Sequence, residues 1–134
     1  MAIDKVMLVD DDACIRRIGE ISLTKVGKWS VISCASAAAA LESLEQQTPD
    51  VILLDVMMPQ LDGVAAFPEV VRRTKGRVPI IFMTAKVMNT EVLKYRELGA
   101  AGVITKPFEP TSLPLEIASI VEDYHRAQAR SVCA

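Results

Sequence analysis

A short, uninterrupted apolar run that ends in a carboxylate constrains the fold of this chain most. Residues 51–54 are all apolar, and Asp55 follows them directly. A run of this length between polar residues is typical of a β-strand buried on both faces. A carboxylate is too costly to leave in such a core without partners. Pro59 and the pair Asp62-Gly63 then predict a loop. We therefore expect a rigid strand that delivers Asp55 to the mouth of a loop.

The same pattern recurs along the chain and predicts the fold class. Further short apolar segments indicate strands at residues 5–9, 29–34, 80–83 and 102–105. Helical spacing, capping residues and glycine stops predict helices near residues 13–26, 37–46, 63–75, 91–98 and 112–126. We expect Pro68 to delay or kink the third of them. Strands that alternate with helices predict an α/β fold, a doubly wound, five-stranded parallel sheet flanked by five helices.

Length and composition indicate one small globular domain. The chain has 134 residues, of which 51% are hydrophobic. We place the domain at residues 1–125 and a frayed tail at residues 126–134. The net charge of −2 argues against direct contact with nucleic acid or with an anionic membrane. Three scattered cysteines and the absence of a long apolar run favour the cytoplasm.

Polar groups follow four of the predicted strands. Asp10 and Asp11 follow the first strand, Asp55 ends the third, Thr84 ends the fourth and Lys106 follows the fifth. Each residue alone has an ordinary explanation as a cap, a turn or a surface group. In a parallel sheet, however, ligands bind outside the carboxyl ends of the strands. The joint placement therefore predicts one site at that edge.

The chemistry of these residues favours a cation and a phosphoryl group. Two carboxylates about 4 Å apart repel by about 4 kcal/mol at an effective dielectric constant of about 20. Ligands that offer only oxygen atoms suit Mg²⁺. Lys106 adds a positive charge and Thr84 a hydroxyl donor, so an anion with several oxygens fits beside the metal. Asp55 would be the carboxylate nucleophile that receives it.

Four motifs together resemble the response-regulator receiver domain of two-component signalling. They are "MLVDDD", "DVILLDVMMPQLDG", "IIFMTA" and "GVITKPF", and the match covers about residues 4–125. The resemblance is to single-domain chemotaxis receivers and implies a flavodoxin-like sheet with strand order 2-1-3-4-5. It implies a phosphorelay protein that receives its phosphoryl group from a histidine kinase or a phosphotransfer protein and signals to a downstream protein. Such a domain catalyses only its own phosphorylation and dephosphorylation and is not otherwise an enzyme.

The resemblance also assigns roles at the site. Asp55 would be the phosphoacceptor. The ligands of Mg²⁺ (or Mn²⁺) would be the side chains of Asp10, Asp11 and Asp55 and the backbone carbonyl of Met57.

The remaining roles concern the predicted fourth and fifth strands. Thr84 and Lys106 would contact the phosphoryl group, and the Lys106-Pro107 peptide bond would be cis. Receivers usually carry an aromatic switch residue three positions before the lysine, whereas this chain has Val103 there.

Three alternatives stay open at this point. The chain would also fit a receiver domain cut from a hybrid histidine kinase. A haloacid-dehalogenase-like phosphatase would use Asp10 as nucleophile and Asp12 beside it, but it leaves Asp55 and Lys106 unexplained. An unphosphorylated scaffold would not need the intact acidic set.

Overall fold

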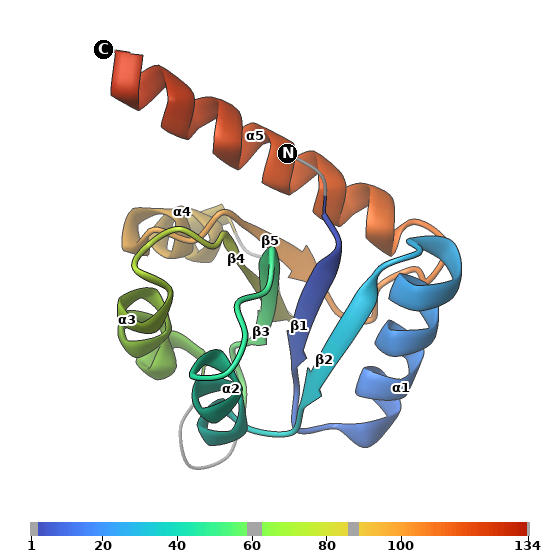
Figure 1. Cartoon of the computed structure of the whole chain (residues 1–134). Coiled ribbons are helices and arrows are strands. Elements are labelled where there is room, and N and C mark those ends of the chain that lie inside the picture. The colour runs from blue at the N-terminus through green and yellow to red at the C-terminus, as the bar shows by residue number, and fades with distance from the viewer. Residues whose placement is uncertain (1–2, 59–62, 86–88, 134) are drawn as a thin grey trace.

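A central parallel sheet organises the computed structural model, which describes residues 3–58, 63–85 and 89–133. The strands are β1 (Lys5–Val9), β2 (Ser30–Cys34), β3 (Val51–Asp55), β4 (Ile80–Thr84) and β5 (Gly102–Thr105). They lie in the order β2-β1-β3-β4-β5, and all neighbours are parallel (Figure 1). The predicted fold and strand order are confirmed. The carboxyl ends of β1, β3, β4 and β5 therefore meet at one edge of the sheet.

Helices cover both faces of the sheet. They are α1 (Ala13–Ile21), α2 (Ala37–Leu44), α3 (Gly63–Thr74), α4 (Asn89–Leu98) and α5 (Leu113–Cys133). In Figure 1, α1 and α5 lie on one side of the sheet and α2, α3 and α4 on the other. A π-helical segment (Ser22–Val26) replaces the regular end that we expected for the first helix.

Strand residues alternate between two hydrophobic cores. Leu54 and Phe82 belong to the core under α2, α3 and α4. Leu53 and Met83, one position away on the same strands, belong to the core under α5. All four side chains have an exposed fraction of 0%. Because β3 and β4 are buried on both faces, they carry the continuous apolar runs from which they were predicted.

Two expectations about helices are corrected. The third helix starts at Gly63 and runs through Pro68, so the proline does not delay its start. Pro68 is exposed, which lets solvent rather than the core accommodate the interrupted hydrogen-bond ladder. The last helix also ends later than expected, since α5 continues to Cys133. Residues 115–133 contain no proline or glycine, so nothing in their sequence stops the helix.

The predicted loop after β3 is described only in part. Residues 59–62, which include Pro59 and Asp62, lie outside the described residues. Among the helices that the structure describes, none combines the length and the apolar character needed to cross a bilayer.

Candidate functional site

Asp55 lies at the carboxyl end of β3 and is 1% exposed. Its Oδ1 atom accepts a hydrogen bond from the backbone N–H of Met57 at 3.1 Å. Its Oδ2 atom lies 3.1 Å from Nζ of Lys106, with which it forms an ion pair. The buried carboxylate thus has the polar partners without which its position would be prohibitively costly.

The three aspartates that follow β1 have different surroundings. Asp10 is fully buried, with its Oδ1 accepting the N–H of Asp12 at 2.9 Å and its Oδ2 accepting Nζ of Lys106 at 3.0 Å. Asp11 is exposed. Asp12 is the N-cap of α1, and its side chain accepts the N–H of Cys14 at 2.8 Å. Asp12 therefore serves the helix, whereas Asp10 and Asp11 remain beside Asp55.

Asp10, Asp11 and Asp55 form one acidic cluster. Each offers a carboxylate oxygen, and these oxygens lie within 4.8 Å of one another. Two of the three residues are buried and the third opens to solvent. A set of oxygen ligands with one open side suits a hard divalent cation, which keeps several water ligands. The cluster could therefore hold a metal ion.

Burial and charge together set the protonation of the site. Burial raises the pKa of Asp55, and the charge of Asp10 raises it further, whereas the Met57 N–H and Lys106 act in the opposite direction. Burial alone would lower the pKa of Lys106, but its hydrogen bonds to Asp10 and Asp55 outweigh that effect and raise it. Lys106 is accordingly a fixed positive charge between two carboxylates.

Thr84 and Lys106 lie next to each other at the same edge. Thr84 ends β4 and is 5% exposed. Its backbone carbonyl accepts the N–H of Lys106 at 2.8 Å, directly after β5. The peptide bond between Lys106 and Pro107 is cis. The four strand ends thus bring together Asp10, Asp11, Asp55, Thr84 and Lys106.

The two other predicted residues differ from this group and from each other: Met57 contacts Asp55 through its backbone, and Val103 lies within β5. The side chain of Met57 is 76% exposed, and its backbone N–H is the part that contacts Asp55. Val103 is half-buried within β5 and pairs in register with Phe82 of β4. Val103 therefore sits inside the sheet, before the edge at which the acidic cluster lies.

Arg16 is a residue of the site that the sequence analysis missed. Its Nη1 atom donates to the backbone carbonyl of Asp10 at 2.7 Å, and the side chain is half-buried. This hydrogen bond connects α1 to the segment that carries Asp10 and Asp11. The spacing of Arg16 from the cap Asp12 places it one turn into α1 but does not identify its hydrogen-bond partner. The neighbouring Arg17, which is exposed, carries the same charge, so composition alone cannot select between them.

Solved structures of receiver proteins share this fold. The chemotaxis protein CheY4 of Vibrio cholerae has a TM-score of 0.80 and 29% identity, over 89% of this chain and 99% of that one. The BeF3-activated receiver domain of DrrB, a protein of Thermotoga maritima, has a TM-score of 0.76 and 26% identity, over 90% of this chain and 99% of that one.

Curated relatives resemble the chain over most of its length. A probable transcriptional regulator, ycf27 of Guillardia theta, is 37% identical over 92% of this chain and 48% of the relative. The alkaline phosphatase synthesis transcriptional regulatory protein PhoP of Bacillus subtilis is 34% identical over 87% of this chain and 48% of the relative. The chain thus spans about half the length of these relatives.

These relatives correct the expectation of no direct contact with nucleic acid. Their names describe transcriptional regulators, a class of protein that acts on DNA. The expectation rested on a net charge of −2. A net charge is a sum over the residues of this chain and says nothing about how charge is distributed on a surface. The chain also spans only about half the length of each relative. It was therefore no ground for excluding nucleic acid from the function of the protein.

The family itself follows from a match along most of the sequence. The model of the response regulator receiver domain matches residues 6–118. That range contains the acidic cluster, Thr84, Val103 and Lys106, and it covers the sheet except for Lys5, helices α1 to α4 and the start of α5. The chain belongs to the response regulator receiver domain family.

Proposed function

We propose that the chain is the phosphoacceptor of a two-component phosphorelay and that Asp55 receives the phosphoryl group. The observation that carries this proposal is the surroundings of Asp55. A buried carboxylate at a strand end lies against a fixed lysine and within 4.8 Å of two further carboxylates. Such a group is held in place as a nucleophile, and the family match supports this role.

Mg²⁺ is the metal that the donor set fits best. The acidic cluster offers three carboxylates and no nitrogen or sulfur ligand from its own members. We infer that Asp10, Asp11 and Asp55 hold the ion, with the Met57 carbonyl as a further ligand, and Mn²⁺ is the closest substitute. When bound, the ion would neutralise charge on the oxygens of the transferring group.

The remaining residues would act on the phosphoryl group. Lys106 already lies 3.0–3.1 Å from Asp10 and Asp55 and can turn its charge toward phosphoryl oxygens. The hydroxyl of Thr84 would donate to another of these oxygens. Both contacts would stabilise negative charge during the transfer.

The proposed donor is a phosphohistidine on a kinase or a phosphotransfer protein. An Asp55 oxygen attacks phosphorus, the N–P bond of the donor breaks, and an O–P bond forms. The imidazole that leaves takes up a proton, and the product is an aspartyl phosphate. The names of the curated relatives support control of transcription as the output of the longer proteins. We infer that this chain supplies the receiver part of such a response.

Incubation with a small phosphodonor and Mg²⁺, followed by mass mapping, tests the assignment. Acetyl phosphate should add one phosphoryl mass to the peptide that contains Asp55, and Asp55→Asn should remove the addition. Asp12→Asn is the matched control, because it changes a neighbouring carboxylate but keeps a good helix cap. A modified Asp10 with an unmodified Asp55 would instead support the phosphatase alternative and refute this assignment.

Metal titration provides a separate test. Asp11→Ala should weaken Mg²⁺ binding, because the ion is left with mostly water ligands. Asp12→Asn should bind Mg²⁺ like the unchanged chain. Calorimetry or an NMR titration measures both affinities. An unchanged affinity in Asp11→Ala would remove Asp11 from the ligand set.

A further inference from the structure

Helix α4 has one large ring that reaches the sheet. The ring of Tyr95 lies 5.0 Å from the ring of Phe82 on β4, measured between centroids, with an interplanar angle of 57°. Phe82 also contacts Phe67 of α3, at 5.4 Å between centroids. Tilted pairs at these separations are favourable aromatic contacts. The Phe82 ring thus contacts one ring from each of α3 and α4.

Tyr95 is the principal anchor of α4 among its described side chains, which are those of residues 92–98. Within this range only Val92 and Tyr95 are half-buried, and the remaining side chains are exposed. Leu93 is 61% exposed and Leu98 is 45% exposed, so neither leucine fixes the helix to the core. We therefore expect the position of α4 relative to the sheet to depend strongly on the contact between Tyr95 and Phe82.

The strand that carries Phe82 also carries Thr84. Residues two positions apart on a strand point to the same face, so Phe82 and Thr84 share one face of β4. Val103 of β5 is the register partner of Phe82, and Tyr95 and Val103 pack against the same core cluster. The face that leads from Thr84 toward β5 thus carries a valine on the strand and a tyrosine supplied by α4.

We propose that Tyr95 is the positioning residue that couples the phosphoacceptor site to α4. The Tyr95 ring would have two positions, one in contact with Phe82 and one away from it. Phosphorylation of Asp55 would change the balance between these positions through Thr84. This proposal rests on the function proposed above. A ligand shifts such an equilibrium only through contacts that differ between the two states. Here the differing contacts are those of the Tyr95 ring, which can rest on Phe82 or turn toward solvent.

Tyrosine suits this position because it tolerates either environment. Its ring is apolar and its hydroxyl is polar, so neither burial nor exposure of the tip is prohibitive. A phenylalanine would keep the ring contact, whereas a leucine would keep an apolar side chain without a ring. The two substitutions therefore separate the ring from simple burial.

Fluorine NMR of the chain labelled with 3-fluorotyrosine tests the movement of the ring directly. The chain has two tyrosines, so two resonances are expected, and Tyr124→Phe assigns them. Tyr124 lies on α5, where its hydroxyl is 3.4 Å from the carbonyl of Gly76, and serves as the internal control. Beryllofluoride with Mg²⁺ should shift the Tyr95 resonance and leave that of Tyr124 nearly unchanged. A Tyr95 resonance that stays in place while the amides around Asp55 respond would overturn the proposal.

Substitutions test whether the ring is needed for coupling. Tyr95→Leu should still bind beryllofluoride at Asp55, seen in the amide shifts of Asp55 and Lys106, but should lose more than half of the shift change in residues 92–98. Tyr95→Phe should retain that change. Leu93→Ala, an exposed change on the same helix, should behave like the unchanged chain. Thermal unfolding checks that each variant is folded at the temperature of the experiment.

The outcomes distinguish this coupling from the function on which it rests. A full α4 response in Tyr95→Leu would overturn the role of the ring and leave the phosphoacceptor assignment intact. If the amides of Asp55 and Lys106 do not respond even in the unchanged chain, the phosphoacceptor assignment fails and the coupling fails with it.

Discussion

Helices α3 and α4 cover the same face of the sheet, but they are attached to it in different ways. Helix α3 buries Ala66, Phe67, Val70 and Thr74. The side chains of α4 that the structure describes offer only half-buried contacts, chiefly the ring of Tyr95. One helix is therefore part of the core, whereas the other rests on it.

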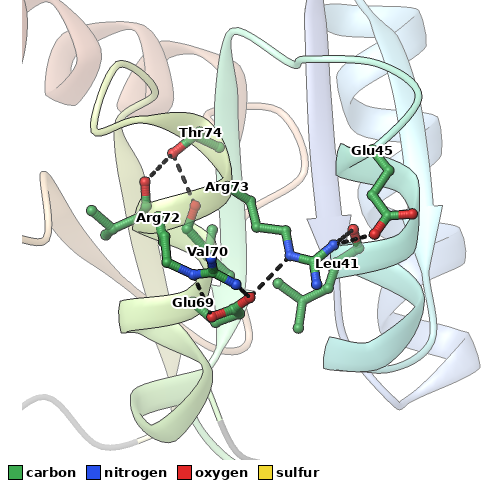
Figure 2. Close-up of polar contacts among 8 residues, drawn as sticks. Leu41, Glu45, Glu69, Val70, Arg72, Arg73 and Thr74 are labelled. Atoms are coloured by element: carbon green, nitrogen blue, oxygen red, sulfur yellow. Dashed lines mark hydrogen bonds and ion pairs between the residues drawn. The ribbon is translucent and has the colours of Figure 1, made fainter.

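Polar contacts add to the difference. Arg73 of α3 bonds to Glu69 on its own helix at 3.1 Å and also reaches Glu45 at the end of α2 (Figure 2). The hydroxyl of Thr74 donates to the carbonyl of Val70 at 2.9 Å, which keeps its polar atom satisfied in the core. Individually such exposed ion pairs contribute little, but this group links two neighbouring helices.

The two helices should therefore differ in how they respond to phosphorylation of Asp55. Moving α3 would expose several buried side chains and break its link to α2. Among the side chains described on α4, those of residues 92–98, movement of the helix would disturb chiefly the contact of the Tyr95 ring. Segments with few buried contacts open at the lowest free-energy cost. We therefore expect α4 to respond to phosphorylation and α3 to stay in place.

The largest effect is expected from removing Lys106, which lies beside Asp55. Lys106→Ala should slow phosphorylation by about 10²–10³-fold, because a fixed charge on the transferring group is lost. Mg²⁺ binding should stay nearly intact, since a lysine does not ligate a cation. Single-turnover phosphorylation and a separate metal titration measure the two effects. Phosphorylation at the original rate, with a normal α4 response, would reduce Lys106 to a structural role.

Thr84→Ala should remove most of the response of α4. The hydroxyl is the group that would follow the phosphoryl oxygens, and Phe82 and the Tyr95 ring lie beyond it on the same face of the sheet. Backbone amide shifts of residues 92–98, recorded with beryllofluoride and Mg²⁺, measure this response. Thr84→Ser is the control and should keep the response because it keeps the hydroxyl.

Val103→Ala should mainly cost stability. The side chain is half-buried against the same core as Tyr95, and its loss should lower the free energy of unfolding by about 1–2 kcal/mol. Denaturant unfolding measures the change, and the α4 response should persist. A silent α4 in Val103→Ala together with a normal one in Thr84→Ala would place the switch in β5 and not in α4.

An acid titration of the metal-free protein should show that Asp55 and Glu69 take up protons in different pH ranges. The pKa of Asp55 is raised by burial, so its carboxylate should take up a proton at a higher pH than an ordinary aspartate. Hydrogen bonds from Arg72 and Arg73 lower the pKa of Glu69 from 4.5 to about 2. The stability that Glu69 contributes is present above pH 4.5 and lost as pH falls toward about 2. Carboxyl carbon NMR records both titrations, and the reverse order would contradict the assignment of the two sites.

The smallest effect is expected from the link between α2 and α3. Arg73→Ala removes the contact with Glu45, whereas the control Arg72→Ala removes only a pair within α3. The loss of stability should be slight and should shrink at high salt, because exposed pairs are screened. Thermal unfolding at low and high salt measures it. A loss of the α4 response in Arg73→Ala would instead show that the signal depends on α3.

Much of the fold could be predicted because the strands leave a direct trace in the sequence. Strands buried on both faces, such as β3 and β4, are continuous apolar runs that end at a polar residue. The course of α3 and the length of α5 were harder to predict from the sequence. The passage of α3 through Pro68 depends on that residue facing solvent, and the length of α5 depends on the absence of a stop signal.

The site was predictable wherever the sheet alone places a residue. Asp10, Asp55, Thr84 and Lys106 follow from strand ends, which topology brings together. Spacing alone could not show that Asp12 caps a helix while Asp11 stays at the site.

The contacts of Arg16 and Tyr95 were also out of reach, for a different reason. Both side chains belong to helices, and their partners depend on how each helix docks against the sheet. The spacing of apolar residues predicts a helix but not which residue of the sheet a given helix side chain contacts.

Hydrogen–deuterium exchange of the unchanged protein, with and without beryllofluoride and Mg²⁺, tests whether α4 responds to phosphorylation while α3 stays in place. Peptides from α3 and α4 are compared in the same experiment, so α3 is the internal reference. A clear change of exchange is expected in α4 and none in α3 when the phosphoryl mimic is bound. An equal change in the two helices, or a change in α3 alone, would contradict this expectation.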